Sequence, residues 1–344
     1  MKAEALSGAS LTAANIDGAV LAQTVVAQDD HHHAVLHKGR ILARADWPVV
    51  ASAGIDELHI VRIERGDVHE DEAARRLAEL VTGPGVTRHD PVESQVRLSA
   101  AVNGIFQVDV LRLQALNSVD EISVFTLFDG QLVPRGKTVA GVKVTPFVVP
   151  AARLLEAERV TDGRDLVRVL AFKPMRVGIL VRERLEPAQR AKFQQSIAMK
   201  VGWFGSAISD IRYVADDVSA IEATIRQLLA GADLLLTAGA NATDPLDPTL
   251  VALERMGARM EKRGAPAHPG SAVWLAYLRA KPIFGVAACG MFSKATVLDL
   301  ILPRLFTGAG VSAADFNGLG HGGLLSKDMA FRFPSYAGRS EEDG

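Results

Sequence analysis

The sequence predicts an α/β fold in which a parallel-sheet domain of three layers follows a mixed α+β region. Two observations in the second half carry this prediction. From Arg176 to Phe306, short apolar runs alternate with helical patterns. The run Arg176–Val181 is continuously apolar after its first residue, as is typical of a strand buried on both faces. Such alternation predicts a parallel sheet with helices on both of its faces.

The elements of this half follow in order, and each has its own local signal. A helical pattern over 187–201 stops at Gly202, and a strand pattern covers 209–214. Ser219-Ala-Ile-Glu222 reads as a capping box that opens the next helix, which ends at Gly231. A strand follows at 233–237, and Asp247-Pro248 opens a further helix as N-cap and first residue. The last predicted pair is a strand at 282–287 and a helix from Ser293 to about Phe306.

The first half has shorter apolar runs that Gly, Pro and polar pairs interrupt. Alternation over 57–63 predicts a strand, and 70–81 predicts a charged amphipathic helix. Residues 141–149 predict a strand in which Pro146 marks an edge or a bulge. Because the charged stretch after Arg153 resembles a connector, we expect four parts: an N-terminal mixed α+β region at 1–152, a linker at 153–170, the α/β domain at 171–310 and a Gly-rich tail at 311–344.

Composition excludes several classes of protein. The 344 residues are 48% hydrophobic and 23% charged, as in ordinary globular chains. A formal charge of −2 gives no field for capturing a polyanion, so we expect no nucleic-acid partner. The single cysteine, Cys289, excludes a disulfide framework. No apolar run is long enough to cross a bilayer, and polar residues interrupt the apolar stretch near the N-terminus, so we expect no membrane span, no signal peptide and a cytoplasmic location.

The first candidate loop is Thr237-Ala-Gly-Ala-Asn-Ala-Thr-Asp-Pro-Leu-Asp247, which leads from a predicted strand into a helix. Its small residues let backbone N–H groups approach an anion such as phosphate. Asp244 and Asp247 suit a Mg²⁺ ion that keeps several waters and bridges to that phosphate. The alternative is structural: Asp247 only caps its helix and Asp244 only shapes a turn. The loop lacks the Lys of a P-loop and the third Gly of a dinucleotide motif.

The second candidate loop runs from Gly285 through Cys289 and Gly290 to Ser293 and Lys294. A serine and a lysine at a helix start again suit a phosphate. Cys289 is either a nucleophile or, more commonly for a lone cysteine beside a strand, a small packing residue.

Histidines give weaker signals. Asp29 to His33, with His37, resemble a metal site, but adjacent histidines point in different directions, so a solvated loop is the favoured interpretation. His268 is either a polar ligand contact or a turn residue, and His321 lies in a glycine-rich stretch that either folds over a site or acts as a linker.

Residues 176–308 resemble the molybdopterin-binding domain shared by molybdopterin adenylyltransferases, molybdenum insertases and gephyrin. The features that match are the strand Arg176-Val-Gly-Ile-Leu-Val, the segment 231–240 with the acidic loop after it, Pro266-Ala-His-Pro-Gly270, and Lys281-Pro-Ile-Phe-Gly-Val with its following turn. Weaker matches, among them 39–42, 66–74, 142–150 and 318–325, resemble molybdopterin-binding regions that precede a nucleotidyltransferase-like domain. The family's paired glycines are Ala238-Gly239 here, and its Pro-Gly-Asn-Pro turn is Ala-Ala-Cys-Gly.

The resemblance implies a protein that binds molybdopterin or the molybdenum cofactor in biosynthesis, storage or delivery. One alternative is an enzyme that adenylylates molybdopterin with Mg-ATP or inserts molybdate, with Asp244 and Asp247 as catalytic and metal-binding residues. Another is a non-catalytic regulatory protein with a degenerate pocket. The expected partners are a pterin phosphate, further copies of the chain, and other cofactor-biosynthesis proteins or a molybdoenzyme. The expected cofactor-binding residues are Thr237, Gly239, Ala240, Asn241, His268, Pro269, Gly270, Gly285, Cys289, Gly290, Ser293 and Lys294.

Overall fold

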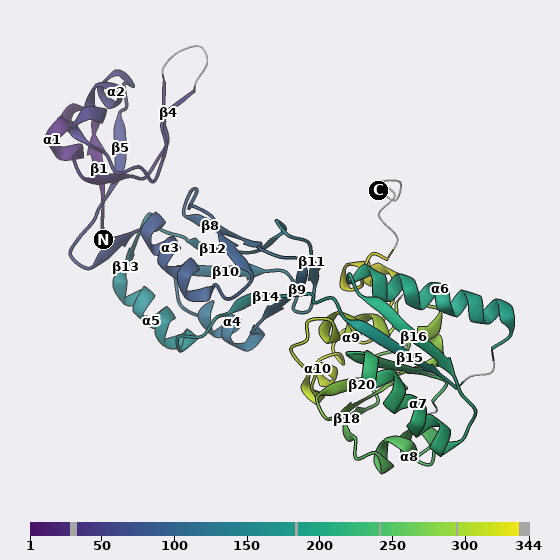
Figure 1. The fold of residues 1–344 in the computed structure, drawn as a ribbon. Helices are drawn as coiled ribbons and strands as arrows, with labels where there is room; N and C mark the ends of the chain where they lie inside the picture. Colours follow the sequence, from purple (N-terminus) through teal and green to yellow (C-terminus); the bar gives the residue numbers. More distant parts are fainter. Residues whose placement is uncertain (28–32, 183–184, 241, 294, 337–344) are drawn as a thin grey trace. The chain divides into compact units, whose positions relative to one another are not determined.

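The computed structural model describes residues 1–27, 33–182, 185–240, 242–293 and 295–336 (Figure 1). The chain divides into two compact units. Unit 1 comprises residues 1–102, 106–129 and 133–169, and unit 2 comprises 103–105, 130–132 and 170–344.

Unit 1 begins with a small antiparallel sheet in the order β1-β5-β2. The predicted strand over 57–63 is confirmed as β5 (Glu57–Arg62): Leu58 and Ile60 are buried and His59 between them is exposed, although the alternation ends at Val61, which is also buried. This face packs against Val50 and the residues around it. The remaining elements here are β1 (Lys2–Ser7), η1 (Gly8–Ser10), α1 (Ala13–Ile16), β2 (Ala19–Leu21), β3 (Val25–Val26), β4 (Ala34–Leu36), η2 (Arg44–Asp46) and α2 (Trp47–Ser52).

The rest of unit 1 is organised around α3 (Glu70–Val81), which the sequence predicts to the residue. Three acidic residues in its first turn favour the helix through its dipole. Ala73, Leu77 and Val81 face a core shared with a sheet in the order β10-β12-β8-β7. The other elements are β6 (Asp67–His69), β7 (Val86–Arg88), β8 (Gln95–Ala100), β9 (Gly104–Val108), α4 (Val110–Leu116), β10 (Ile122–Thr126), β11 (Leu132–Val133), β12 (Thr138–Val144), β13 (Val148–Pro150), α5 (Ala151–Thr161) and β14 (Val167–Ala171).

Two expectations for this half need correction. The strand predicted over 141–149 is broken, because β12 ends at Val144 and β13 begins only at Val148, with Pro146 in the gap. The stretch 153–170, expected as a linker, contains most of α5 and β14. Its charged residues alternate with Leu154 and Ala157, which are buried in the core of unit 1, so the charges mark the outer face of a packed helix.

Unit 2 contains a six-stranded sheet in the order β16-β15-β17-β20-β19-β18. The strands β16 (Ala207–Tyr213), β15 (Arg176–Val181), β17 (Leu234–Ala238) and β20 (Lys281–Val286) are mutually parallel, as predicted. Two further strands were not predicted: β19 (Trp274–Leu278) pairs antiparallel with β20, and β18 (Arg259–Arg263) pairs antiparallel with β19. The sheet is therefore mixed, with its parallel part as expected.

Helices cover both faces of this sheet and make the predicted three layers (Figure 1). On β17, Leu234 and Leu236 face one core and Leu235 faces the other. The first core is shared with α6 (Pro187–Trp203) and α9 (Val297–Leu305), and the second with α7 (Val218–Gly231) and α8 (Pro248–Arg255).

The starts of two helices differ from the prediction. The N-cap of α7 is Asp217, whose carboxylate accepts a hydrogen bond from the Ala220 amide at 2.7 Å, so Ser219 lies inside the first turn and is no cap. The last of the predicted helices, α9, begins at Val297 rather than at Ser293, with Thr296 as its N-cap. The residues before it instead form the short helix η3 (Ala288–Met291).

The expected C-terminal tail is folded onto unit 2 as far as it is described. It contains α10 (Ala313–Asn317) and η4 (Lys327–Arg332), and it buries Phe316 and Leu319. His321 is exposed between these elements. The glycines of this stretch therefore allow close packing, since a Cβ at Gly323 would lie 2.4 Å from the Pro266 carbonyl oxygen.

Candidate functional site

The carboxyl ends of three parallel strands of unit 2 lie in register. Val181 of β15 pairs with Ala238 of β17, and Ala238 pairs with Val286 of β20. The segments that follow these residues therefore leave the sheet at one edge. Ligands of open α/β sheets bind at this edge, and it is where the sequence places the two candidate loops.

The first loop leaves β17 at Gly239, whose φ of +86° is a conformation that favours glycine. Asp244 is exposed, and its side chain accepts a hydrogen bond from the Leu246 amide at 2.9 Å. Its carbonyl oxygen accepts another from the Asp247 amide at 3.2 Å. Asp244 therefore shapes the turn, which matches the structural alternative for this residue.

Asp247 caps α8, as predicted, and is buried with 2% of its surface exposed. Its Oδ1 atom accepts hydrogen bonds from the Thr249 amide at 2.8 Å and from Nη1 of Arg182 at 2.5 Å. Arg182 is the first residue after β15, and it also binds Asp216 at 2.9 Å. Burial lowers the pKa of Arg182, but the bonds to both aspartates outweigh burial and raise it overall. The carboxylate expected to bind Mg²⁺ thus already holds a cation.

Thr237 lies at the carboxyl end of β17, one residue before the strand ends. It is fully buried, and its Oγ1 atom has no hydrogen-bond partner among the described residues. Buried hydroxyls without partners are rare because desolvation is not compensated. Thr237 therefore places a buried hydroxyl, without a partner in the described part of the chain, near the carboxyl end of β17.

The second loop follows β20 and turns through η3. Gly290 is buried, and a Cβ there would lie 3.2 Å from Val286 and 3.5 Å from Oγ1 of Thr296. Cys289 and Ser293 are exposed. The Ser293 amide donates to the Cys289 carbonyl oxygen at 3.0 Å, which closes the turn.

The His268–Gly270 segment meets this loop through the start of α9. The Pro269 carbonyl oxygen accepts a hydrogen bond from the Val297 amide at 3.1 Å. A Cβ at Gly270 would lie 3.0 Å from that same amide nitrogen. His268 is exposed, and its backbone pairs with residues 323–325. The structure thus brings Pro269, Gly270 and Gly290 together around the start of α9. The Val297 amide, the first of α9, already donates its hydrogen bond to Pro269.

The remaining predicted site residues behave differently. Gly285 is buried inside β20, and a Cβ there would lie 2.1 Å from the Trp274 ring, so this glycine makes room for a neighbouring side chain. Ala240 packs partly against the α7 and α8 core. Asn241, Lys294 and the run from Asp29 to His32 lie outside the described residues.

A buried ion pair touches the second loop at the Ser293 carbonyl oxygen and is not evident from the local sequence patterns. Lys200 of α6 and Asp299 of α9 are both fully buried and bonded to each other. The available signal was one charged residue inside the apolar stripe of each predicted helix, with opposite signs. Buried charges of this kind occur almost only in pairs.

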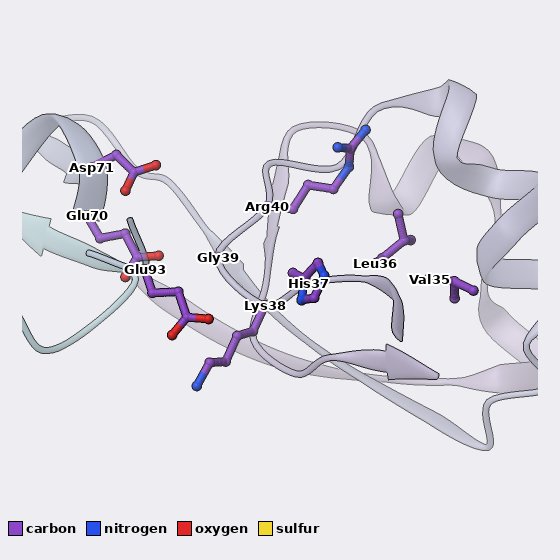
Figure 2. Close-up of a pocket in the computed structure, with 9 residues that line it drawn as sticks. All are labelled: Val35, Leu36, His37, Lys38, Gly39, Arg40, Glu70, Asp71 and Glu93. Atoms are coloured by element: carbon purple, nitrogen blue, oxygen red, sulfur yellow. The ribbon is translucent and has the colours of Figure 1, made fainter. Parts of the chain in front are cut away.

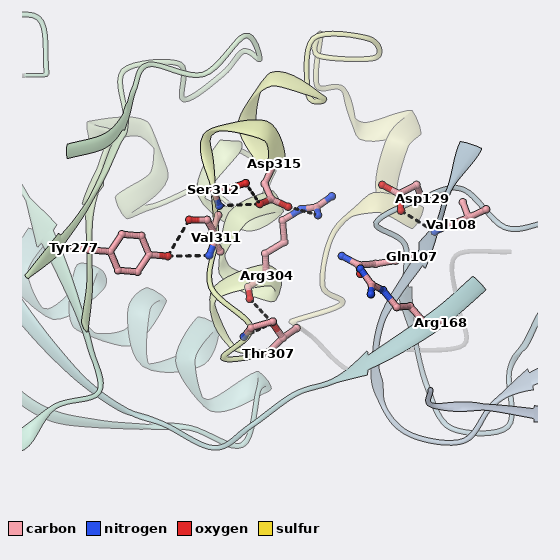
Figure 3. A network of polar contacts seen from close by, with 11 residues as sticks. Gln107, Val108, Asp129, Arg168, Tyr277, Arg304, Thr307, Val311, Ser312 and Asp315 are labelled. Carbon is pink, nitrogen blue, oxygen red and sulfur yellow. Dashed lines mark hydrogen bonds and ion pairs between the residues drawn. The ribbon is translucent and has the colours of Figure 1, made fainter. Parts of the chain in front are cut away.

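The stretch after α9 is held to the sheet by side-chain hydrogen bonds (Figure 3). The Tyr277 hydroxyl of β19 donates to the Val311 carbonyl oxygen at 2.9 Å and accepts from the Val311 amide at 2.8 Å. Arg304 donates to Asp315 at 2.9 Å, and the Asp315 carboxylate caps α10. These bonds tie Arg304, Val311 and Asp315 to one another's surroundings in unit 2.

Across the described residues, no group of three or more His, Cys, Asp and Glu side chains is placed to hold a metal ion. Within the same residues, no helix combines the length and apolar character that crossing a bilayer requires.

Unit 1 contains a separate cavity of about 450 Å³ (Figure 2). Its lining includes Gly39, with a φ of +83°, and Glu70 at the start of α3. A Cβ at Gly39 would lie 2.3 Å from the Glu70 carboxylate, and the positive φ at this position also favours glycine. Glu70 is 5% exposed, and burial, reinforced by the neighbouring Asp71, raises its pKa.

We expect Glu70→Gln to stabilise unit 1 at neutral pH. A raised folded-state pKa means that the folded state prefers the protonated carboxyl, so wild-type stability falls as pH rises from about 4.5 through the raised value. Glutamine does not titrate, so its advantage should grow over that window and vanish below it. Hydrogen exchange of the α3 amides between pH 4 and 8 measures this. Glu72→Gln, an exposed neighbour, is the control, and an advantage independent of pH would contradict the assignment.

The sequence around the two candidate loops of unit 2 matches a known family of domains. Residues 180–307 match the family model described as "Probable molybdopterin binding domain". The match covers well under half of the 344 residues, and it includes both candidate loops, Arg182 and α6 to α9. No curated protein matches the chain.

The chain is also similar to solved structures of proteins from molybdenum cofactor biosynthesis. The molybdopterin biosynthesis MoeA protein from Pyrococcus horikoshii is 14% identical, with a TM-score of 0.30, over 71% of this chain and 81% of that protein. Molybdenum cofactor biosynthesis protein B is 16% identical, with a TM-score of 0.31, over 39% of this chain and 93% of that protein. What the comparisons show for this chain is thus a match of residues 180–307 to a probable molybdopterin-binding domain.

Proposed function

We propose that this protein binds molybdopterin, or the molybdenum cofactor made from it, at the carboxyl edge of the sheet in unit 2, and that it serves the biosynthesis, storage or delivery of that cofactor. The family match over residues 180–307 carries the proposal. The site geometry supports it, because two loops containing Gly239 and Gly290 leave adjacent parallel strands at the same edge.

The residues at this edge fit a flat heterocycle with a phosphate. Thr237 has a buried hydroxyl in need of a partner, which a ring nitrogen or oxygen would satisfy. The first amides of α8 and α9 are taken by Asp247, Asp299 and Pro269. The exposed Ser293 hydroxyl is therefore the proposed phosphate donor, rather than the helix ends.

The carboxylates at 244 and 247 have structural roles in this proposal. Asp247 neutralises Arg182 and caps α8, and Asp244 shapes the turn before it. A Mg²⁺ ion at Asp247 would have to displace the arginine from a buried position, which is costly. We therefore propose that pterin binding does not depend on Mg²⁺ at these residues.

Gly239→Val tests the site. Valine should place a branched side chain where the ligand approaches and strain a backbone at φ +86°, so affinity for molybdopterin should fall by at least about tenfold. Anaerobic calorimetric titration of molybdopterin measures the change.

The matched control is Gly257→Val. Gly257 also has a positive φ, +72°, and follows α8 at the end opposite its N-terminus, away from the loops. It carries the same backbone strain without the steric effect on the ligand. Equal affinities of the two variants, or no binding by the wild type, would refute the proposed site.

A further inference from the structure

The C-terminal segment of the described chain reaches the buried ion pair that touches the second loop. Tyr336 is 9% exposed, and its hydroxyl donates to Oδ1 of Asp299 at 2.7 Å. Its ring lies against Trp203 with centroids 6.4 Å apart, and the Trp203 indole N–H donates to the Ser335 carbonyl oxygen at 3.0 Å. The segment is thus docked by specific bonds.

The same ion pair bonds to Ser293 and to Thr296. On one side, Lys200 Nζ donates to the Ser293 carbonyl oxygen at 2.7 Å. On the other, Oδ2 of Asp299 accepts from both the amide and the hydroxyl of Thr296 at 2.9 Å, which fixes the start of α9. The Ser293 amide in turn closes the turn on Cys289.

A continuous chain of bonds therefore leads from Tyr336 through Asp299 and Lys200 to the second loop. Burial, together with the Asp299 charge, raises the pKa of Tyr336 well above its ordinary value, so the phenol keeps the proton that it donates. A bond between a neutral donor and a buried carboxylate is among the stronger hydrogen bonds in proteins. Its loss would remove one of the donors to Oδ1 of Asp299, the same atom that Lys200 binds while it holds Ser293.

We propose that Tyr336 is a positioning residue for the pterin site, acting through Asp299 and Lys200 to hold the second loop in its binding conformation. This inference rests on the proposed function. In this proposal the segment around Tyr336 supports a loop, 288–293, that lies more than forty positions earlier in the chain.

Tyr336→Phe in the full chain tests the inference, because it removes one hydroxyl and keeps the ring. The first measurement is amide hydrogen exchange. Residues 288–293 should exchange about tenfold faster, the factor expected for one lost charge-assisted bond, while β17 stays protected. The second measurement is anaerobic molybdopterin titration, in which affinity should fall by a similar factor.

Tyr277→Phe is the matched control, because that hydroxyl also makes two hydrogen bonds in unit 2, but to Val311 and not to the loop. It should leave both readouts unchanged. If Tyr336→Phe destabilises the whole unit, Trp203→Phe replaces it, since it removes the bond that docks Ser335 and leaves both charges of the Lys200–Asp299 pair in place.

The outcomes separate the two proposals. Unchanged exchange of the loop in Tyr336→Phe would overturn the inference, as would faster exchange with unchanged pterin affinity. If the wild type fails to bind molybdopterin, the proposed function fails, and with it the positioning role, even where exchange shows that Tyr336 anchors the loop.

Discussion

Lys200→Met should destabilise unit 2 by about 3–5 kcal/mol, the cost typical of removing one partner from a buried ion pair. Both Lys200 and Asp299 are fully buried, so the remaining carboxylate has no water to replace the ammonium. Equilibrium unfolding in urea at pH 7 measures the loss. In a Trp47→Phe background, the remaining tryptophans, Trp203 and Trp274, both report on unit 2.

Two variants control this result. Lys192→Met removes an exposed lysine from the same helix and should change stability by no more than about 0.5 kcal/mol. The double variant Lys200→Met with Asp299→Asn removes both charges and should recover most of the loss, because no unpaired charge remains. Similar losses at positions 192 and 200 would show that the pair is not buried as described.

Arg182→Met should cost unit 2 about 3 kcal/mol and weaken pterin binding as well. The substitution leaves Asp247, which is 2% exposed, without its cation and frees the end of the first loop at the start of α8. The same urea titration, followed by molybdopterin calorimetry, measures both effects.

A neighbouring arginine gives the comparison. Arg212 on β16 pairs with Asp210 at the surface, with over half of its side chain exposed, so Arg212→Met should cost at most about 1 kcal/mol. Adding Asp247→Asn to Arg182→Met should restore stability, since asparagine still caps α8 and carries no charge. Equal costs at 182 and 212, or no rescue, would refute the role assigned to the pair.

The sequence predicts the parallel part of unit 2 well because each element has its own local signal. Continuous apolar runs mark β15 and β17, and Asp247-Pro248 marks the start of α8. The strands β18 and β19 escape prediction for different reasons. β18 is a run of mostly charged residues, Arg259-Met-Glu-Lys-Arg263, without an apolar face, and Trp274–Leu278 lacks a flanking helical pattern to set it apart.

The candidate site is less predictable than the fold because its polar partners are distant in sequence. Both loops are evident from their small residues and their position after strands. The partner of Asp247 is 65 residues earlier, and the partner of Lys200 is 99 residues later. Hydrophobic periodicity indicates which face of a helix or strand is buried. It does not indicate which charged residue of another element pairs with a charge on that face. The start of α9 was misplaced because the Thr296 cap depends on Asp299, a residue that looks like an interruption of an apolar run.

The charged strand β18 has a consequence for assembly. It forms one edge of the sheet, where an unpaired row of backbone groups would otherwise accept a strand from another molecule. Arg259 and Glu261 pair with each other there, and Lys262 bonds to Asn317. A second copy that extended the sheet across this edge would have to desolvate these side chains. Self-association of this protein through a continuous sheet across β18 is therefore disfavoured, and a homo-oligomer would have to use a different surface.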